Sequence, residues 1–128
     1  MAPTAMLTVE STAANVRTAR HFATRLADLV LPDDRVLTPS DVQALALMVS
    51  ELVGNAVEHG DGAVTVDVTS TGSRIRVEIT DGGEGVPERR CVWPDTPTGR
   101  GLGIVDALAS SWGWEGRPDG GKAVWFEY

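Results

Sequence analysis

Two neighbouring stretches of alternating apolar residues place the tightest limit on how this chain can fold. In Ala63–Thr69 every second residue is valine, and in residues 75–79 isoleucine and valine occupy every second position. An alternation of period two puts the apolar side chains of a strand on one face. The turn residues Thr71-Gly72-Ser73 lie between the two stretches, which indicates an antiparallel hairpin with one apolar face. Other elements must cover that face.

Two segments before the hairpin have the helical spacing of apolar residues that could supply this cover. The first runs from a cap at Ser11 or Thr12 to about Val30. The second follows Thr38, a good N-cap, and precedes Gly60, which is placed to end the helix in a left-handed conformation. We therefore expect two amphipathic helices against the hairpin.

The remaining segments complete a two-layer arrangement. Strands are expected at Leu7–Glu10, Trp112–Glu115 and Ala123–Tyr128, the last two joined by a hairpin turn in which Gly121-Lys122 lies. A third helix is expected at Leu102–Ser111, with Leu102, Val105, Leu108 and Ala109 facing inward. This order of elements predicts an α+β fold, a two-layer sandwich whose mixed, mostly antiparallel sheet is covered on one face by about three helices. Because 128 residues suit one domain, residues 1–128 are expected to form a single domain.

The bulk properties exclude several classes of function. A formal net charge of −7 argues against a nucleic-acid binder, which would need a basic face, and against attachment to anionic lipid. Cys91 is the only cysteine, so a disulfide framework and a cysteine metal cluster are excluded. The segment Met1–Met6 does not resemble a signal peptide, and no apolar stretch is long enough to span a membrane. We therefore expect a cytoplasmic protein.

The second helix carries a polar pair beside its apolar stripe. Glu51 and Asn55 are four residues apart and so share one face of the helix. The amide oxygen of Asn55 suits Mg²⁺, which prefers oxygen ligands and keeps waters or phosphates as its other ligands. Glu51, one turn away, could act as a base on an attacking hydroxyl. Taken alone, the pair is better explained as a surface glutamate and a structural asparagine, because short motifs often occur by chance.

Two glycine-rich segments follow at the ends of other elements. Asp81–Gly85 comes directly after a strand, where a carboxylate can accept a hydrogen bond from the exocyclic amine of adenine. Gly99–Gly103 opens a helix, where glycine N–H groups and Arg100 could hold phosphate. Neither segment matches the dinucleotide fingerprint or a phosphate loop ending in Gly-Lys-Ser/Thr. A plain Asp-Gly turn and packing glycines remain the alternatives for each segment alone.

Taken together and in this order, the motifs resemble those of the GHKL, or Bergerat-fold, ATPases, which include gyrase, Hsp90, sensor histidine kinases and MutL. Residues 50–60 (SELVGNAVEHG) resemble the N box, Asp81–Gly85 the first glycine box and Gly99–Gly103 the second, with an ATP lid between them. The short chain is most similar to the anti-sigma-factor serine kinases, in particular the short actinobacterial ATP-binding regulators.

The resemblance implies a role for each matching position. Asn55 would hold Mg²⁺, Glu51 would be the catalytic general base toward a serine hydroxyl, and Asp81 would recognise adenine. The nucleotide-binding residues implied by the boxes are Asn55, Asp81, Gly83, Gly85, Arg100, Gly101, Leu102 and Gly103. Two departures stand out: Lys122-Ala123 replaces the threonine that often follows the last glycine, and Gly54 replaces a threonine of the N box.

The resemblance implies an ATP-dependent protein-serine kinase that binds a sigma factor and phosphorylates an anti-sigma antagonist, with ATP and Mg²⁺ as cofactors. Such proteins often form homodimers. The alternative is a nucleotide-dependent protein-binding module that transfers phosphate slowly or never. A third hypothesis, a sandwich without a ligand, would leave three glycine-rich or polar motifs as coincidence.

Overall fold

The computed structural model describes residues 4–31, 35–59, 62–72, 74–82, 100–118 and 120–128. Within these residues, three helices and five strands occur. In chain order they are β1 (Thr4–Val9), α1 (Ala14–Val30), α2 (Pro39–His59), β2 (Val64–Thr71), β3 (Arg74–Asp81), α3 (Arg100–Leu108), β4 (Ser111–Gly116) and β5 (Lys122–Glu127). None of the described helices is long and apolar enough to cross a membrane.

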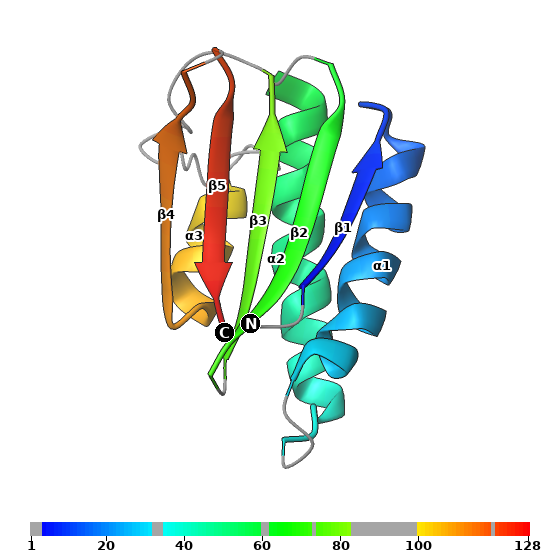
Figure 1. Ribbon diagram of the computed structural model, residues 1–128, viewed down its shortest axis with the longest axis vertical. Helices are drawn as coiled ribbons and strands as arrows, with labels where there is room; N and C mark the ends of the chain where they lie inside the picture. Colours follow the sequence, from blue (N-terminus) through cyan, green and yellow to red (C-terminus); the bar gives the residue numbers. More distant parts are fainter. Residues whose placement is uncertain (1–3, 32–34, 60–61, 73, 83–99, 119) are drawn as a thin grey trace.

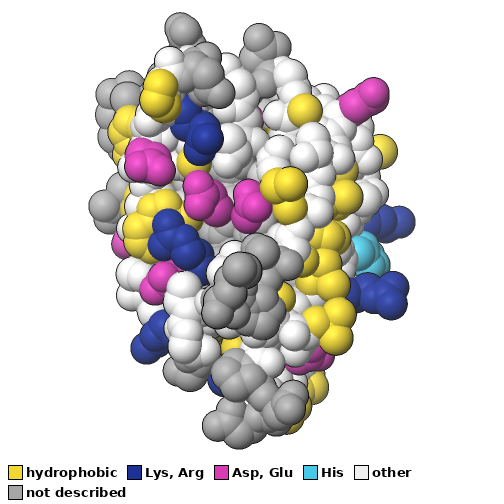
Figure 2. Space-filling view, in the orientation of Figure 1, with side chains coloured by type: hydrophobic (Ala, Val, Ile, Leu, Met, Phe, Trp, Pro, Cys, Tyr) yellow, Lys and Arg dark blue, Asp and Glu magenta, His cyan; other side chains and the backbone are white. Residues whose placement is uncertain are grey.

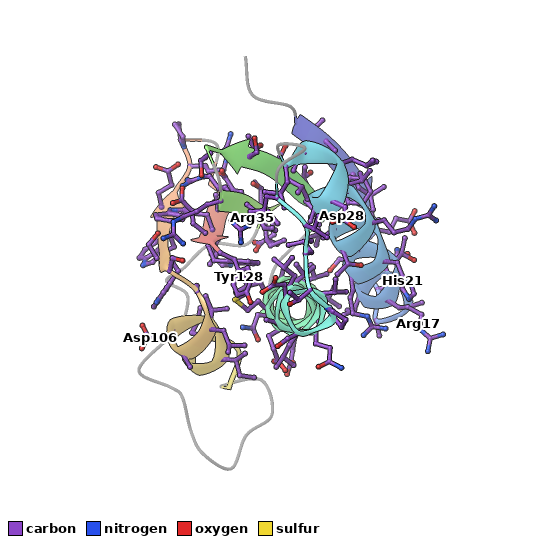
Figure 3. The ribbon with its side chains drawn as sticks, turned by 90° about the horizontal axis from the view of Figure 1, so that it is seen from below. Arg17, His21, Asp28, Arg35, Asp106 and Tyr128 are labelled. Atoms are coloured by element: carbon purple, nitrogen blue, oxygen red, sulfur yellow. The ribbon has the colours of Figure 1, made fainter. Side chains whose placement is uncertain are left out.

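The sheet forms one layer and the helices form the other. The strand order is β1-β2-β3-β5-β4, and each neighbouring pair is antiparallel. Helices α1, α2 and α3 lie side by side behind the sheet, with α2 between the other two (Figures 1 and 3). The predicted fold class is therefore confirmed, although no parallel pair occurs among the described strands.

The alternation of the central hairpin decides which face the helices cover. Residues of β2 and β3 are buried and half-buried in turn along both strands. The buried set meets apolar side chains of all three helices in one core. Its largest fully buried members are Phe126, Leu45, Met48, Ile75, Ile79, Val49, Val53, Val64, Val66, Val68, Val77 and Val105. None of the described helices covers the other face of the sheet, which we call the bare face and which carries charged side chains (Figure 2).

The start of α2 follows the sequence prediction closely. The Asp41 amide donates to Thr38 Oγ1 at 3.1 Å, and the Thr38 amide donates to Asp41 Oδ2 at 2.9 Å. This reciprocal pair satisfies backbone donors that a helix start leaves open. The C-terminal residue adds a third contact, because the Tyr128 hydroxyl donates to Asp41 Oδ1 at 2.7 Å. The predicted end at Gly60 lies outside the described residues.

Three local predictions were wrong. Neither Ser11 nor Thr12 caps α1 through its side chain: the Ser11 hydroxyl donates to the Val57 carbonyl, and α1 begins at Ala14. Helix α3 begins at Arg100 and ends at Leu108, so it is shifted toward the N-terminus relative to the predicted range. Leu108, expected to face inward, is 39% exposed because the chain leaves the helix there to enter β4.

Candidate functional site

Three strands start or end at one end of the sheet: β2 and β5 start there, and β3 ends there. Asp81, the last residue of β3, pairs with Lys122, the first residue of β5. Thr65 of β2 pairs with Thr80, so Val64, where β2 begins, lies at the same end. The short connection from α2 into β2 brings the C-terminal half of α2 to this end as well. The C-terminal half of α2, which carries most of the N box, and Asp81 therefore lie at the same end of the sandwich.

Helix α2 presents Glu51 and Asn55 on the flank that faces α3. Its other flank is fixed by contacts with α1, where Arg20 Nη1 donates to Ser50 Oγ at 3.4 Å. At 100° per residue, Asn55 lies about 140° around the helix from Ser50, on the same side as the fully buried Met48 two turns earlier. Both Glu51 and Asn55 are half-buried. Helix α3 lies on that side of α2 (Figure 3).

Helix α3 points its N-terminus toward the same end of the sheet. Its C-terminal end is held at the far end of β5, where the Ser110 amide donates to the Glu127 carbonyl at 2.7 Å. Trp112 Nε1 also donates to Asp106 Oδ1 at 2.8 Å, which ties the helix to β4. Because β5 starts at Lys122, a helix anchored beside Glu127 directs its first turn toward Asp81. A helix N-terminus favours anions through its free N–H groups and its dipole.

Residues 100–103 of the second glycine box form this first turn of α3, and Gly99 lies outside the described residues. Leu102 is buried in the core, and Gly103 is half-buried. Arg100 and Gly101 belong to the helix, and nothing is described of the Arg100 side chain. Gly83 and Gly85, predicted to bind nucleotide, lie outside the described residues, as does the predicted lid. The individual binding roles stay predictions.

The sequence analysis missed a buried ion pair at Asp81. Lys122 Nζ lies 3.2 Å from Asp81 Oδ1, and the two side chains are only 10% and 3% exposed. Lys122 was expected within a hairpin turn, but it is the first residue of β5 and points to the helix-covered side of the sheet. Asp81 and Lys122 meet because of the register of β3 against β5, and no short sequence motif predicts that register.

Two glycines near the site have different physical explanations. A Cβ at Gly121 would overlap the backbone carbonyl oxygen of Asp81, so close approach of two backbones requires a glycine there. Among the described residues, a Cβ at Gly54 would meet no atom within 4 Å. Close packing therefore explains Gly121 but not Gly54.

A shallow depression lies at the same end of the sheet but opens on the bare face. It measures about 210 Å³ and is lined by Ala63, Thr65, Thr80, Asp81, Gly82, Arg117 and Gly121. Thr65 and Thr80 alternate with buried residues and so point away from the helices. This depression is thus on the opposite side of the sheet from Glu51 and Asn55.

The described residues contain no group of three His, Cys, Asp or Glu side chains that could hold a metal ion by themselves. A Mg²⁺ ion at this site would rest on Asn55, with water and phosphate oxygens as its other ligands. This donor set fits the ordinary coordination of Mg²⁺ with nucleotides.

Comparison with known proteins agrees with this arrangement. The model of the histidine kinase-like ATPase domain matches residues 9–128. No curated protein gives a significant match. Among solved structures, the chain is similar to the histidine kinase domain of the blue-light activated histidine kinase of Erythrobacter litoralis EL346, with a TM-score of 0.54 and 22% identity.

That similarity covers 97% of this chain and 66% of the solved chain, so the likeness extends over nearly all of this chain but only part of the kinase domain. At this level of identity it supports the fold. The family match spans nearly the whole sequence and supports ATP binding and a regulatory role. The chain belongs to the family of histidine kinase-like ATPase domains, within the GHKL superfamily.

Proposed function

We propose that this chain is an Mg-ATP-dependent protein-serine/threonine kinase that acts as an anti-sigma factor. It would bind a sigma factor and phosphorylate a serine of an anti-sigma antagonist. The observation that carries the proposal is the convergence of three groups at one end of the sandwich. These are the Glu51 and Asn55 flank of α2, the buried Asp81 and the N-terminus of α3.

Each group suits one part of a nucleotide. The Asp81 carboxylate accepts hydrogen bonds and suits the exocyclic amine of adenine. The first turn of α3 offers N–H groups to the phosphates. Helical spacing puts Asn55 on the flank of α2 away from α1, where its amide oxygen would hold Mg²⁺. When bound, the metal would neutralise charge on the phosphate oxygens.

Glu51 supplies the carboxylate that phosphoryl transfer to serine needs and that nucleotide binding alone does not need. In the proposed reaction the serine oxygen bonds to the γ-phosphorus, the bond from that phosphorus to the β,γ-bridging oxygen breaks, and ADP leaves. The serine proton goes to the Glu51 carboxylate. Glu51 lies one turn before Asn55 on the same flank of α2, so base and metal ligand would face one substrate.

The proposal is tested by a binding measurement followed by a transfer assay. Calorimetry with Mg-ATP should show binding by the wild type, and Asn55→Ala should abolish the part that depends on Mg²⁺. A pull-down in ATP and in ADP identifies retained partners, and phosphoserine is then assayed on them. Glu51→Gln should keep nucleotide binding and lose transfer. Transfer that survives in Glu51→Gln would contradict the role of Glu51.

A second function is favoured by the residues after the last glycine. Lys122-Ala123 stand where the family often has a threonine, and without that hydroxyl a polar contact with phosphate is lost, so the chain could be a nucleotide-dependent protein-binding module with little or no transfer. In that case a partner would be retained in the presence of ATP, and no phosphoserine would form on it. The same pull-down and assay therefore separate the two functions.

A further inference from the structure

The Asp81 carboxylate, at the end of the proposed site that would bind the nucleobase, has a cation beside it. Lys122 Nζ and Asp81 Oδ1 lie 3.2 Å apart, on adjacent strands and in register. Both side chains point to the helix-covered side of the sheet and are nearly buried. A ligand edge that forms a hydrogen bond with Asp81 therefore also comes within reach of Lys122.

Stability alone is a poor reason for a buried ion pair at this position. Removing two charges from water is costly, and well-packed apolar side chains of similar volume often stabilise a protein as well or better. The next inward positions on these strands, Ile79 and Val124, are apolar and pair without charge. The Asp81 and Lys122 pair at the end of the ladder thus calls for a role other than holding the strands together.

The two side chains have opposite hydrogen-bonding capacities. An ionised aspartate only accepts hydrogen bonds, whereas a lysine ammonium has three donors and accepts none. Adenine presents an amine donor at position 6, and guanine presents a carbonyl acceptor there. Beside these, N1 is an acceptor in adenine and a donor in 6-oxopurines such as guanine and hypoxanthine. A lone carboxylate matches the adenine amine and repels a 6-oxo group.

We infer that Lys122 is a specificity-determining residue of the nucleobase end, and that it widens the range of accepted bases from adenine to 6-oxopurines. With adenine, Asp81 would accept from the amine while Lys122 donates to N1. With hypoxanthine, Asp81 would accept from N1–H while Lys122 donates to the 6-oxo oxygen. This inference rests on the proposed nucleotide site.

The test measures the dissociation constants of Mg-ATP and Mg-ITP for the full chain by calorimetry. Adenine and hypoxanthine differ at positions 6 and 1 only, so the ratio of the two constants reports on this edge. We expect the wild type to bind ITP less than about 100-fold more weakly than ATP, within the range of one or two base-edge hydrogen bonds. A wider gap overturns the inference without any variant.

Variants then assign the effect to Lys122. Lys122→Met should weaken both nucleotides, because each loses one hydrogen bond from the ammonium. It should weaken ITP by a further tenfold or so, because the Asp81 carboxylate left alone still matches the adenine amine but repels the 6-oxo group. Lys122→Arg, which keeps a donor cation, should retain the wild-type ratio. Arg76→Met is the matched control, because it removes the cation of the other ion pair between β3 and β5, far from this site.

The outcomes are distinguishable. If the folded wild type binds neither nucleotide, the proposed function fails and the inference fails with it. If ATP binds and ITP is excluded, the inference alone fails. If both bind and Lys122→Met leaves the ratio unchanged, or if Arg76→Met shifts it as much, Lys122 is a structural partner only. Should Lys122→Met not fold, the wild-type ratio decides: ITP bound within about 100-fold of ATP supports the inference, and a wider gap overturns it.

Discussion

Strands β3 and β5 are joined by two cross-strand ion pairs, one near each end of their ladder and one on each face of the sheet. Asp81 and Lys122 lie 3.2 Å apart on the helix-covered face, with side chains 3% and 10% exposed. Arg76 and Glu127 lie 3.4 Å apart on the bare face, with side chains 31% and 24% exposed. Both pairs join the same two strands, and in each pair the two residues lie directly opposite each other in the register.

The difference between the pairs lies in their surroundings. On the bare face the Arg76 guanidinium also stacks over the ring of Trp125, 4.1 Å from its centroid, while water still reaches both partners. Exposed ion pairs contribute little because water solvates each charge without its partner. Beside the helices a charge that loses its partner has no such replacement. The burial of each ion pair, more than the distance between its charges, should therefore decide how much removing one partner costs in stability.

The largest expected effect is on stability after one partner of the buried pair is removed. Lys122→Met should lower the free energy of unfolding by about 3–5 kcal/mol, because the Asp81 carboxylate is left buried without its cation. Urea unfolding followed by circular dichroism measures this loss. The double variant Asp81→Asn with Lys122→Met should recover much of it. If Lys122→Met were as stable as the wild type, water would have to reach the Asp81 carboxylate freely.

A second comparison uses one glycine next to each ion pair. Gly121→Ala should cost about 1–3 kcal/mol, since its Cβ would overlap the Asp81 backbone, which cannot yield without breaking the β3–β5 ladder. Gly113→Ala places its Cβ 2.9 Å from the Trp125 ring, a side chain on the bare face that can shift. Thermal unfolding of both variants should rank Gly121→Ala as the more damaging. The reverse order would show that the strand end adapts more easily than the ring.

An intermediate effect is expected at the contact between the C-terminus and α2. The Tyr128 hydrogen bond, followed by contacts with Thr38, lowers the pKa of Asp41 below its ordinary 3.8, and the same hydrogen bond raises the pKa of Tyr128 above 10.0. A lowered carboxyl pKa gives stability that is present above pH 3.8 and is lost as the pH falls through the folded value. A raised phenol pKa gives stability that is present below pH 10.0 and is lost as the pH rises further.

Tyr128→Phe should therefore cost about 1 kcal/mol at neutral pH, the usual contribution of one hydrogen bond. The melting temperatures of wild type and variant should converge below pH 3.8 and above pH 10.0. Parallel curves over the whole pH range would mean that the contact with Asp41 contributes nothing to stability.

The smallest effect is expected at the exposed pair. Glu127→Gln should change the free energy of unfolding by less than about 1 kcal/mol, and the change should shrink as salt is added. The same urea titration used for Lys122→Met makes the two values directly comparable. A loss as large as that of Lys122→Met would show that burial does not distinguish the two pairs.

Most of the fold could be predicted because it depends on local patterns. The alternation in β2 and β3 identified the hairpin and its buried face, and the capping residue Thr38 located the start of α2. Errors occurred where a residue had competing partners. Ser11 was expected to cap α1, but its hydroxyl instead reaches the Val57 carbonyl of α2, a contact that depends on how the helices pack.

The candidate site could be predicted in part. Glu51 and Asn55 share a helix flank through helical spacing alone, and the order of the motifs indicated that they would meet Asp81. The sequence could not show that Lys122 lies against Asp81, because 41 positions separate them and a shift of one residue in the β3–β5 register would turn Lys122 to the bare face. Lys122 was therefore interpreted as a departure from a family pattern.

The sequence by itself determined which residues form helices and strands, which faces are apolar and which motifs are available for nucleotide. These properties follow from spacing along the chain and from the side chains themselves. Only the tertiary structure decided which charges are buried and which remain in water, and so which of two similar ion pairs lies at the proposed site. Burial depends on the layer that packs over a strand, and no stretch of sequence carries that information locally.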